Sequence, residues 1–259
     1  MKALFAVAGA AALAFLAVPV IAIFLRVSPG TLVRELSDPV ARDALLVSLR
    51  TSALAQALVV AFGTPLAYLL ATRSFRGRSV VLTLVELPLV LPPSVAGVGL
   101  LAAFGRTGLF STSVAFTQAA VVLAVAFVAA PFYVRTAVAA FAGVDASLVE
   151  AARTLGAPPF RVFSRVALPL AAGGLGAGLA LSFARGLGEF GATIMFAGSL
   201  QRVTQTLPLA IYAEFARSFD VALAIGALLV TFSFALLLVV KWLRFDWTSA
   251  SRFAPSTSR

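Results

Sequence analysis

The sequence predicts an all-α polytopic membrane protein that crosses the bilayer about six times. Hydrophobic residues make up 61% of the 259-residue chain and charged residues only 12%. The mean hydropathy of +1.04 is far above that of soluble domains, which need polar side chains to cover their surface. The third observation is the length of the apolar runs, because several reach the roughly 20 residues that a helix needs to cross the hydrocarbon core.

Six apolar segments are separated by short loops that hold most of the charges. The first segment is uncharged and about 34 Å long as a helix, enough to span a bilayer. A cleaved signal peptide is the alternative, but this run is long and no A-x-A cleavage site follows it. We expect one transmembrane domain over residues 1–259, with spans at about 3–25, 45–71, 79–104, 114–134, 168–197 and 221–242.

The distribution of Lys and Arg predicts how these spans are oriented. With a cytoplasmic N-terminus, twelve of the 20 basic residues fall in cytoplasmic segments and six in outer segments, while Arg50 and Arg185 fall within spans. This bias favours cytoplasmic termini in the inner (cell) membrane, and it places the loop at about 145–167 in the cytoplasm. The formal net charge of +10 is therefore interpreted as a topology signal, and no nucleic-acid partner is expected.

Missing residue types exclude several kinds of chemistry. The chain has no Cys and no His, which excludes disulfides, thiolate or imidazole metal sites and His-based catalytic triads. Its only lysines are Lys2 and Lys241, so no GxxxxGK[ST] phosphate loop exists. We expect no cofactor, no metal and no catalytic residue in this chain, and an intramembrane hydrolase is improbable. If ATP is used, another chain must bind it.

The loop at about 145–167 looks like a helix-turn-helix of a soluble protein. Ser147 and Glu150 fit an S-x-x-E capping box, and Gly156 stands where a left-handed residue ends a helix. The GAPPF string then restarts a helix, with prolines, Pro158 among them, tolerated at its start. Helices this short are marginal in water, so they need a docking surface, which is either anionic lipid or a cytoplasmic partner.

This loop resembles the cytoplasmic EAA loop of ABC importer permeases, whose pattern is E-A-A-x3-G-x9-I-x-L-P. The chain has Glu150-Ala151-Ala152, then Gly156, then Val166-Ala167-Leu168-Pro169, and only Val for Ile departs from the pattern. The resemblance implies a type I ABC importer permease-like fold whose coupling helix contacts a separate ATP-hydrolysing subunit. The coupling residues that it implies are Glu150, Ala151, Ala152, Gly156, Pro158 and Arg161.

Three further segments, 87–109, 183–198 and 204–212, are similar to the molybdate branch of these permeases, and the likeness extends over about 45–243. Sulfate and tungstate permeases share related segments, so tungstate and sulfate remain alternatives. The resemblance implies import of molybdate by alternating access, with two copies of this chain, two ATPase subunits and an extracytoplasmic oxyanion-binding protein. An ATP-independent anion channel is a remote alternative, because a channel would not require the EAA spacing.

Ionisable and helix-breaking residues within the spans are candidates for the translocation pathway. Charged groups at membrane depth usually face a bundle interior or a wet cavity, and prolines free carbonyls that lipid cannot satisfy. Arg185 and Glu189 are four residues apart and can pair, which would stabilise packing or contact the anion. Arginines do not cluster within the spans, so we expect no tight anion site there. The candidates are Glu86, Pro92, Pro93, Ser94, Arg185, Glu189 and Thr193.

Small residues recur every fourth position along the fifth predicted span, at Gly174, Gly178, Ser182 and Gly186. Such a stripe permits close approach of another helix. We expect it to form a packing seam, which we place at the dimer axis beside the pathway.

Overall fold

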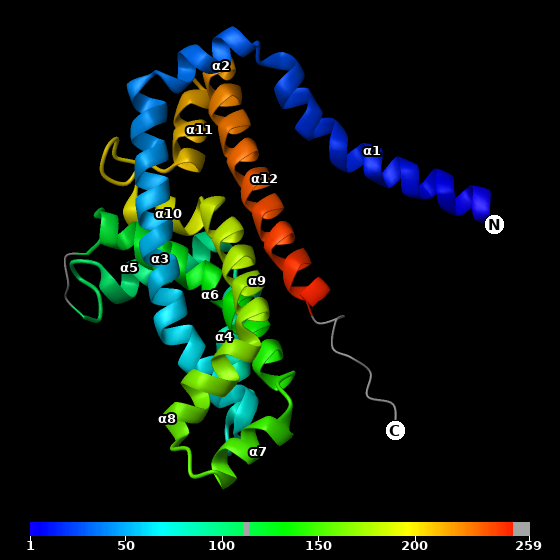
Figure 1. Ribbon diagram of the computed structural model, residues 1–259. Helices are drawn as coiled ribbons and strands as arrows, with labels where there is room; N and C mark the ends of the chain where they lie inside the picture. Colours follow the sequence, from blue (N-terminus) through cyan, green and yellow to red (C-terminus); the bar gives the residue numbers. More distant parts are fainter. Residues whose placement is uncertain (111–113, 251–259) are drawn as a thin grey trace.

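The computed structural model describes residues 1–110 and 114–250, and the secondary structure of this part is helical (Figure 1). Four of its helices are long and apolar enough to cross a membrane, and the count is five if a sharply bent pair is one span. A further long helix, α12, covers the sixth predicted span. The all-α prediction is confirmed.

The helices follow one another with short connections. In chain order they are α1 (Lys2–Arg26), α2 (Pro29–Leu36), α3 (Pro39–Thr72), α4 (Arg78–Val90), α5 (Pro93–Phe104), α6 (Gln118–Ala142), α7 (Ala146–Thr154), α8 (Pro159–Val162), the π-helix η1 (Phe163–Ala167), α9 (Leu168–Leu187), α10 (Gly191–Ala197), α11 (Leu207–Phe215) and α12 (Phe219–Ala250).

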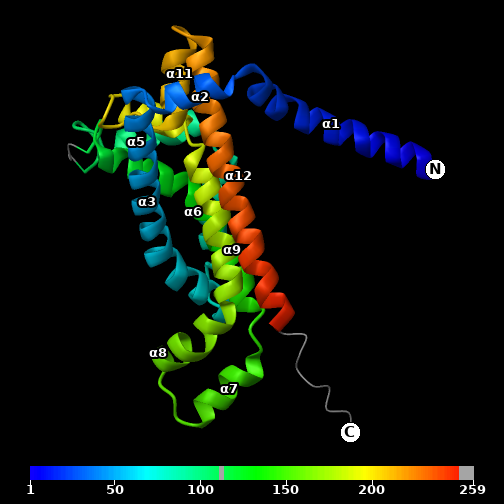
Figure 2. The same cartoon turned by 45° about the horizontal axis from the view of Figure 1, so that its top comes forward.

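The long helices run between two distinct ends of the molecule. Helices α7 and α8 lie at one end, which we call the α7 end, and α2 and α11 lie at the other, the α11 end (Figure 2). Helix α1 leaves the bundle at the α11 end and extends away from it, and none of its residues is buried (Figure 1). The first predicted span is thus a helix that contacts α12 and buries none of its own residues.

Helix α3 is longer than the span predicted at 45–71. Asp38 caps it by accepting a hydrogen bond from the Val40 N–H at 2.7 Å, and Pro39 begins the first turn. Its uncharged part, residues 51–72, is about 33 Å long, which matches the hydrocarbon core. Arg50 and Arg73 bracket this stretch, and the whole helix, Arg50 included, is one of the candidate membrane spans.

The third predicted span is a broken helix. Helices α4 and α5 meet at a bend of 116°, and the break falls at Leu91 and Pro92, between the two helices. Pro88 is tolerated inside α4, whereas the Pro92-Pro93 pair ends one helix and starts the next. The predicted interruption is confirmed, and it is located at the second proline group.

Two helices have bounds that differ from the predicted spans. The fourth span, predicted at 114–134, is α6 over 118–142, because Thr117 caps its N-terminus through a 3.4 Å bond from the Ala120 N–H. The fifth, predicted at 168–197, ends at Leu187, where Gly188 stops the helix before α10 begins. At its other end this helix continues through η1 to Pro159, so of the two short helices predicted in the loop at 145–167 only α7 stands alone.

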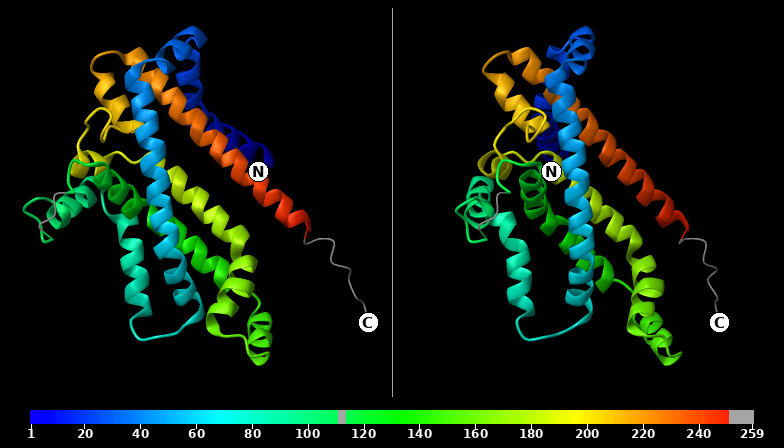
Figure 3. Two further views of the ribbon diagram at one scale, coloured as in Figure 1. Left: turned by 60° about the vertical axis from the view of Figure 1, so that its left-hand side comes forward. Right: turned by 90° about the vertical axis from the view of Figure 1, so that its left-hand side faces the viewer.

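The small-residue stripe of α9 packs against α6 of the same chain (Figure 3). A Cβ on Gly174 would lie 2.5 Å from Ala140 Cβ, and one on Gly178 would lie 3.0 Å from Thr136 Cβ. The Ser182 hydroxyl donates to the Ala129 carbonyl at 3.0 Å. The predicted seam is confirmed, but its placement at the dimer axis is wrong because α6 occupies this face.

Candidate functional site

Helix α7 begins with a different cap from the one the sequence predicted. The Asp145 carboxylate accepts a hydrogen bond from the Ser147 N–H at 2.9 Å, so Asp145 is the N-cap and Ser147 lies inside the helix. Hydrogen bonds from Ser147, first from its side chain and then from its backbone, lower the pKa of the Asp145 carboxyl. The capping box of Ser147 and Glu150 is therefore wrong, because the acidic residue two positions earlier caps the helix.

The C-terminus of α7 has the predicted left-handed glycine. Gly156 has φ +79°, and its N–H bonds to the Arg153 carbonyl at 2.9 Å while the Ala157 N–H bonds to the Ala152 carbonyl at 3.0 Å. These two bonds form a Schellman motif, which satisfies the free carbonyls at the helix end. Pro158 then stands as the N-cap of α8, so the chain turns sharply between the two helices.

The motif residues lie on an exposed surface. Glu150, Ala151, Gly156, Pro158 and Arg161 are exposed and Ala152 is half-buried, and no residue of α7 is buried. Large apolar side chains are exposed beside them: Leu148 at 48%, Leu155 at 88% and Phe160 at 78%. Exposed apolar side chains grouped around a charged motif are typical of a protein-binding surface.

Cavities separate α7 from the helices behind it. One of about 250 Å³ lies between α7 and the ends of α3 and α6, and one of about 370 Å³ lies between α3 and α8. Tyr68 borders both and packs on Phe141 and Phe163, with ring centroids 5.2 and 4.8 Å away. The aromatic cluster anchors the start of α9 firmly, while α7 itself rests on few contacts.

A second group of candidate residues lies where two helix breaks meet inside the bundle. The α4–α5 break touches the α9–α10 break: a Cβ on Gly191 would lie 2.7 Å from Pro93 Cβ. Helix α5 continues this contact, because a Cβ on Gly97 would lie 2.6 Å from the Ala192 carbonyl oxygen. Glycine is needed at both positions for this close approach, which joins two discontinuous helices as in many transporters.

The predicted ion pair within the fifth span is present. An Arg185 terminal nitrogen lies 2.8 Å from Glu189 Oε2, and Glu189 Oε1 accepts the Ala192 N–H at 2.8 Å. The Glu189 side chain is 1% exposed and that of Arg185 is 30% exposed. Both carboxylate oxygens are therefore satisfied, and Arg185 neutralises a buried charge while part of its guanidinium stays open.

The remaining pathway candidates are distributed differently. Glu86 lies on α4, away from the breaks, and its Oε1 is 3.3 Å from Nε of Arg135 on α6. Pro92, Pro93 and Ser94 are exposed at the bend, whereas Thr193 is fully buried. The structure thus brings Pro93 and Ser94 to the α9–α10 break that holds Glu189, and it leaves Glu86 in a separate pair.

Sequence reasoning missed a buried polar group of α3. Gln56 is 4% exposed and neither atom of its side-chain amide has a hydrogen-bond partner in the described residues. It lies next to the seam, since a Cβ on Gly186 would be 3.5 Å from its Nε2. The available signal was a lone amide inside the uncharged stretch 51–72. No group of three or more His, Cys, Asp or Glu in residues 1–110 and 114–250 could hold a metal ion.

Comparison with known proteins decides the family. Residues 63–247 match the model of the family described as "Binding-protein-dependent transport system inner membrane component". The chain belongs to this family. It is therefore a multi-pass membrane permease, and the matched residues include the exposed helix α7.

Individual relatives agree with this assignment. The chain is 47% identical over 231 residues to the molybdenum transport system permease protein ModB of Mycobacterium tuberculosis, covering 85% of this chain and 86% of the relative. It is 34% identical over 242 residues to the molybdate/tungstate transport system permease protein WtpB of Thermococcus kodakarensis, covering 93% and 94%.

A solved structure shows the same fold. A chain from the inward-facing MetNI methionine ABC transporter superposes with a TM-score of 0.64 at 20% identity, covering 80% of this chain and 95% of that one. The type I importer-like architecture predicted from the EAA resemblance is confirmed.

Proposed function

We propose that this permease is the membrane-spanning subunit of an ATP-driven importer that carries molybdate into the cytoplasm. The observation that carries the proposal is the geometry of α7: the motif residues form an exposed, capped helix that the rest of the chain does not bury. The names of the relatives from Mycobacterium and Thermococcus support molybdate as the substrate, with tungstate as the alternative.

In this proposal α7 is the coupling helix and the α7 end is cytoplasmic. The working complex has two copies of the permease, two ATPase subunits and an extracytoplasmic oxyanion-binding protein, in the inner membrane with both termini in the cytoplasm. Leu148, Leu155 and Phe160 supply apolar contact area, and Glu150 and Arg161 supply charge at its rim. A small apolar core with a polar rim is the usual composition of a protein interface.

The transport cycle needs an element that moves when the ATPase closes. Helix α8 continues through η1 into α9 as one run from Pro159 to Leu187. A displacement at the coupling helix therefore reaches the α9–α10 break, where Glu189 and the α4–α5 bend meet. We assign alternating access to relative movement of these two breaks, with Ser94 and Arg185 facing the anion; rigid segments joined at breaks favour such a switch.

The energetics of the cargo require coupling to ATP. Moving a dianion inward against a potential of 100 mV, inside negative, costs about 4–5 kcal/mol before any concentration gradient. A passive channel would let the anion flow outward. The same cost applies to molybdate, tungstate and sulfate. It therefore supports ATP-driven import and does not distinguish among these three substrates.

Two substitutions at the coupling helix test the mechanism. Gly156→Val forces a β-branched residue into the left-handed region, and Glu150→Lys reverses the charge of the motif. We expect each to lower ATP-dependent molybdate uptake at least tenfold and to reduce co-purification of the ATPase, with permease abundance unchanged.

Gly143→Ala is the matched control, because Gly143 precedes α7 with φ −82° and a Cβ there has ordinary contacts, the nearest at 3.5 Å. Unchanged uptake and ATPase assembly in both Gly156→Val and Glu150→Lys would refute the coupling assignment. Calorimetry of the cognate binding protein with molybdate, tungstate and sulfate tests the substrate; tight sulfate binding without molybdate binding would overturn that choice.

A further inference from the structure

A cavity of about 130 Å³ at the α11 end is lined by side chains that suit an anion. Its walls come from three separate parts of the chain: α3, the start of α6 and the segment between α10 and α11. The lining residues are Asp43, Leu46, Val47, Arg50, Gln118 and Arg202. We propose that this cavity is an outer subsite for a tetrahedral oxyanion. The anion occupies it before it reaches the helix breaks. This inference rests on the proposed function.

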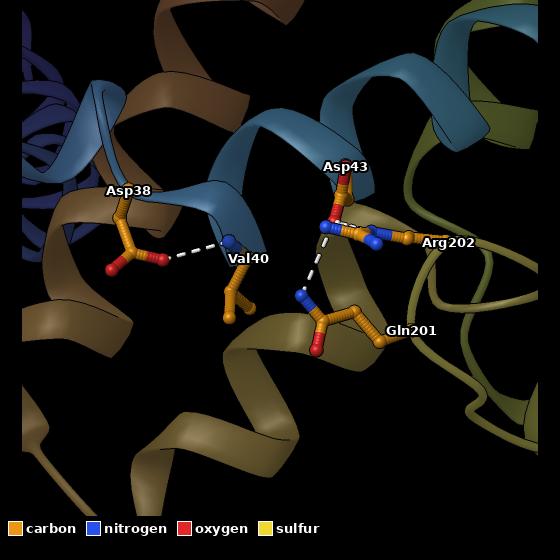
Figure 4. Close-up of polar contacts among 5 residues, drawn as sticks. All are labelled: Asp38, Val40, Asp43, Gln201 and Arg202. Atoms are coloured by element: carbon orange, nitrogen blue, oxygen red, sulfur yellow. Dashed lines mark hydrogen bonds and ion pairs between the residues drawn. The ribbon is translucent and has the colours of Figure 1, made fainter.

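Arg202 is held in place by a specific contact. Its Nε lies 3.0 Å from Asp43 Oδ2, and the Gln201 side-chain amide donates to the same oxygen at 3.2 Å (Figure 4). Because the bond to Asp43 uses Nε, both terminal amino groups of the guanidinium remain available for an anion. Arg202 also has φ +67°, a left-handed conformation that costs energy in a non-glycine residue and that often marks a functional position.

Arg50 supplies a second cation without a paired acid. In the described part of the chain no carboxylate lies within ion-pair distance of its guanidinium, although Asp43 lines the same cavity. Arg50 precedes the uncharged stretch 51–72, so it lies at the outer boundary of the hydrocarbon core in the proposed orientation. A cation there meets an approaching anion before the apolar interior begins.

The charge balance and the size of the cavity favour a small dianion. Two arginines against one aspartate leave a net charge of about +1, and the first turn of α6, where Gln118 lies, adds the partial positive charge of a helix N-terminus. The volume corresponds to about four water molecules at their share of liquid volume. An anion with four oxygen atoms has about that size.

The cavity opens at the surface below the outermost helices of the α11 end, and the Arg202 side chain that lines it is 74% exposed. Arg50 is eleven residues into α3, about 16 Å below its first residue, while α2 and α11 stand above at the same end (Figure 1). The positions of charged residues along the sequence did not predict this site, because Arg50 and Arg202 are far apart in the sequence.

The test is equilibrium dialysis of the full permease–ATPase complex in nanodiscs, without binding protein, against radioactive molybdate. We expect saturable binding that Arg50→Gln and Arg202→Gln each weaken about tenfold, since each removes charge-assisted hydrogen bonds. Arg50→Lys keeps the charge and should retain part of the affinity, which separates loss of binding from misfolding. Arg217→Gln is the matched control, because Arg217 lies at the same end, is equally exposed and pairs with Glu214 outside the cavity.

Several outcomes would overturn the subsite. One is the absence of saturable molybdate binding to the unmodified complex. Another is a loss of molybdate affinity in Arg217→Gln equal to that in the two cavity variants. The third is a defect of Arg50→Gln that affects only docking of the binding protein. Dialysis with sulfate separates this inference from the proposed function. If sulfate binds in an Arg50-dependent way and molybdate does not, the subsite stands and the proposed substrate fails; if the complete transporter imports molybdate at the normal rate in both variants, the subsite fails and the proposed function stands.

Discussion

Helices α7 and α9 lie close together in the sequence and differ sharply in how much of each helix the rest of the chain buries. Helix α9 presents a stripe of small residues that α6 covers at close range, and six of its residues are buried. Helix α7 has well-formed caps at both ends and no buried residue. The difference shows which contacts are made within the chain and which surface the chain leaves uncovered, although a short helix gains little stability by itself.

The largest expected effect concerns the ion pair beside the α9 seam. Arg185→Met leaves the Glu189 carboxylate buried and unpaired, which should destabilise the permease by about 3 kcal/mol. Arg135→Met breaks the exposed pair with Glu86 and should cost at most about 1 kcal/mol. Thermal unfolding of detergent-purified protein, followed by size-exclusion chromatography, compares them. Equal losses would show that the Glu189 pair has no special role in holding this region.

Helix α9 should tolerate a large side chain at Gly176, outside the seam, and not at Gly178, within the seam. Gly178→Leu places side-chain atoms against Thr136 and the Tyr133 carbonyl, and overpacking of this kind costs about 1–3 kcal/mol. Gly176→Leu, two residues earlier on the same helix, meets nothing within 4 Å and should be neutral or slightly stabilising. The same unfolding assay applies. A comparable loss in Gly176→Leu would mean that this face of α9 is also covered.

The smallest expected effect concerns the α7 cap and its dependence on pH. Because the pKa of Asp145 is lowered in the folded protein, its contribution is present above the ordinary Asp pKa of about 3.9 and is lost as pH falls through the lower folded value. Hydrogen exchange in residues 146–155, corrected for intrinsic rates, should therefore be constant from pH 5 to 8 and should accelerate below about pH 4. In Asp145→Ala that acid-dependent acceleration should be absent. If the acceleration persists, another group controls the opening of α7 at low pH.

Local signals in the sequence predicted much of the fold. Apolar runs located most of the spans, the Pro92-Pro93 pair located the break of the third, and Gly156 located the end of α7. Each of these features acts within a few residues of itself, so its consequence can be deduced from neighbours in the sequence. The i, i+4 pair of Arg185 and Glu189 was predictable for the same reason.

Features that depend on distant partners were not predictable. The stripe of α9 predicts a close neighbour and says nothing of which helix provides it. Asp145 and Ser147 are both good caps, and only the observed backbone shows that the helix starts after Asp145. Arg50 and Arg202 line one cavity because α3 and the segment before α11 come together, which no local pattern encodes.

The central claim is that α7 is left exposed so that an ATPase subunit can cover it, and cysteine labelling tests this most directly. The chain has no cysteine, so Leu155→Cys introduces a single reactive thiol at a side chain that is 88% exposed. Leu109→Cys, at a side chain that is 86% exposed between α5 and α6, is the control.

Both single-cysteine variants should react rapidly with a maleimide when the permease is alone. We expect the ATPase subunit to slow labelling of Leu155→Cys at least tenfold and to leave Leu109→Cys unchanged. Equal labelling of Leu155→Cys with and without the bound ATPase would contradict the claim.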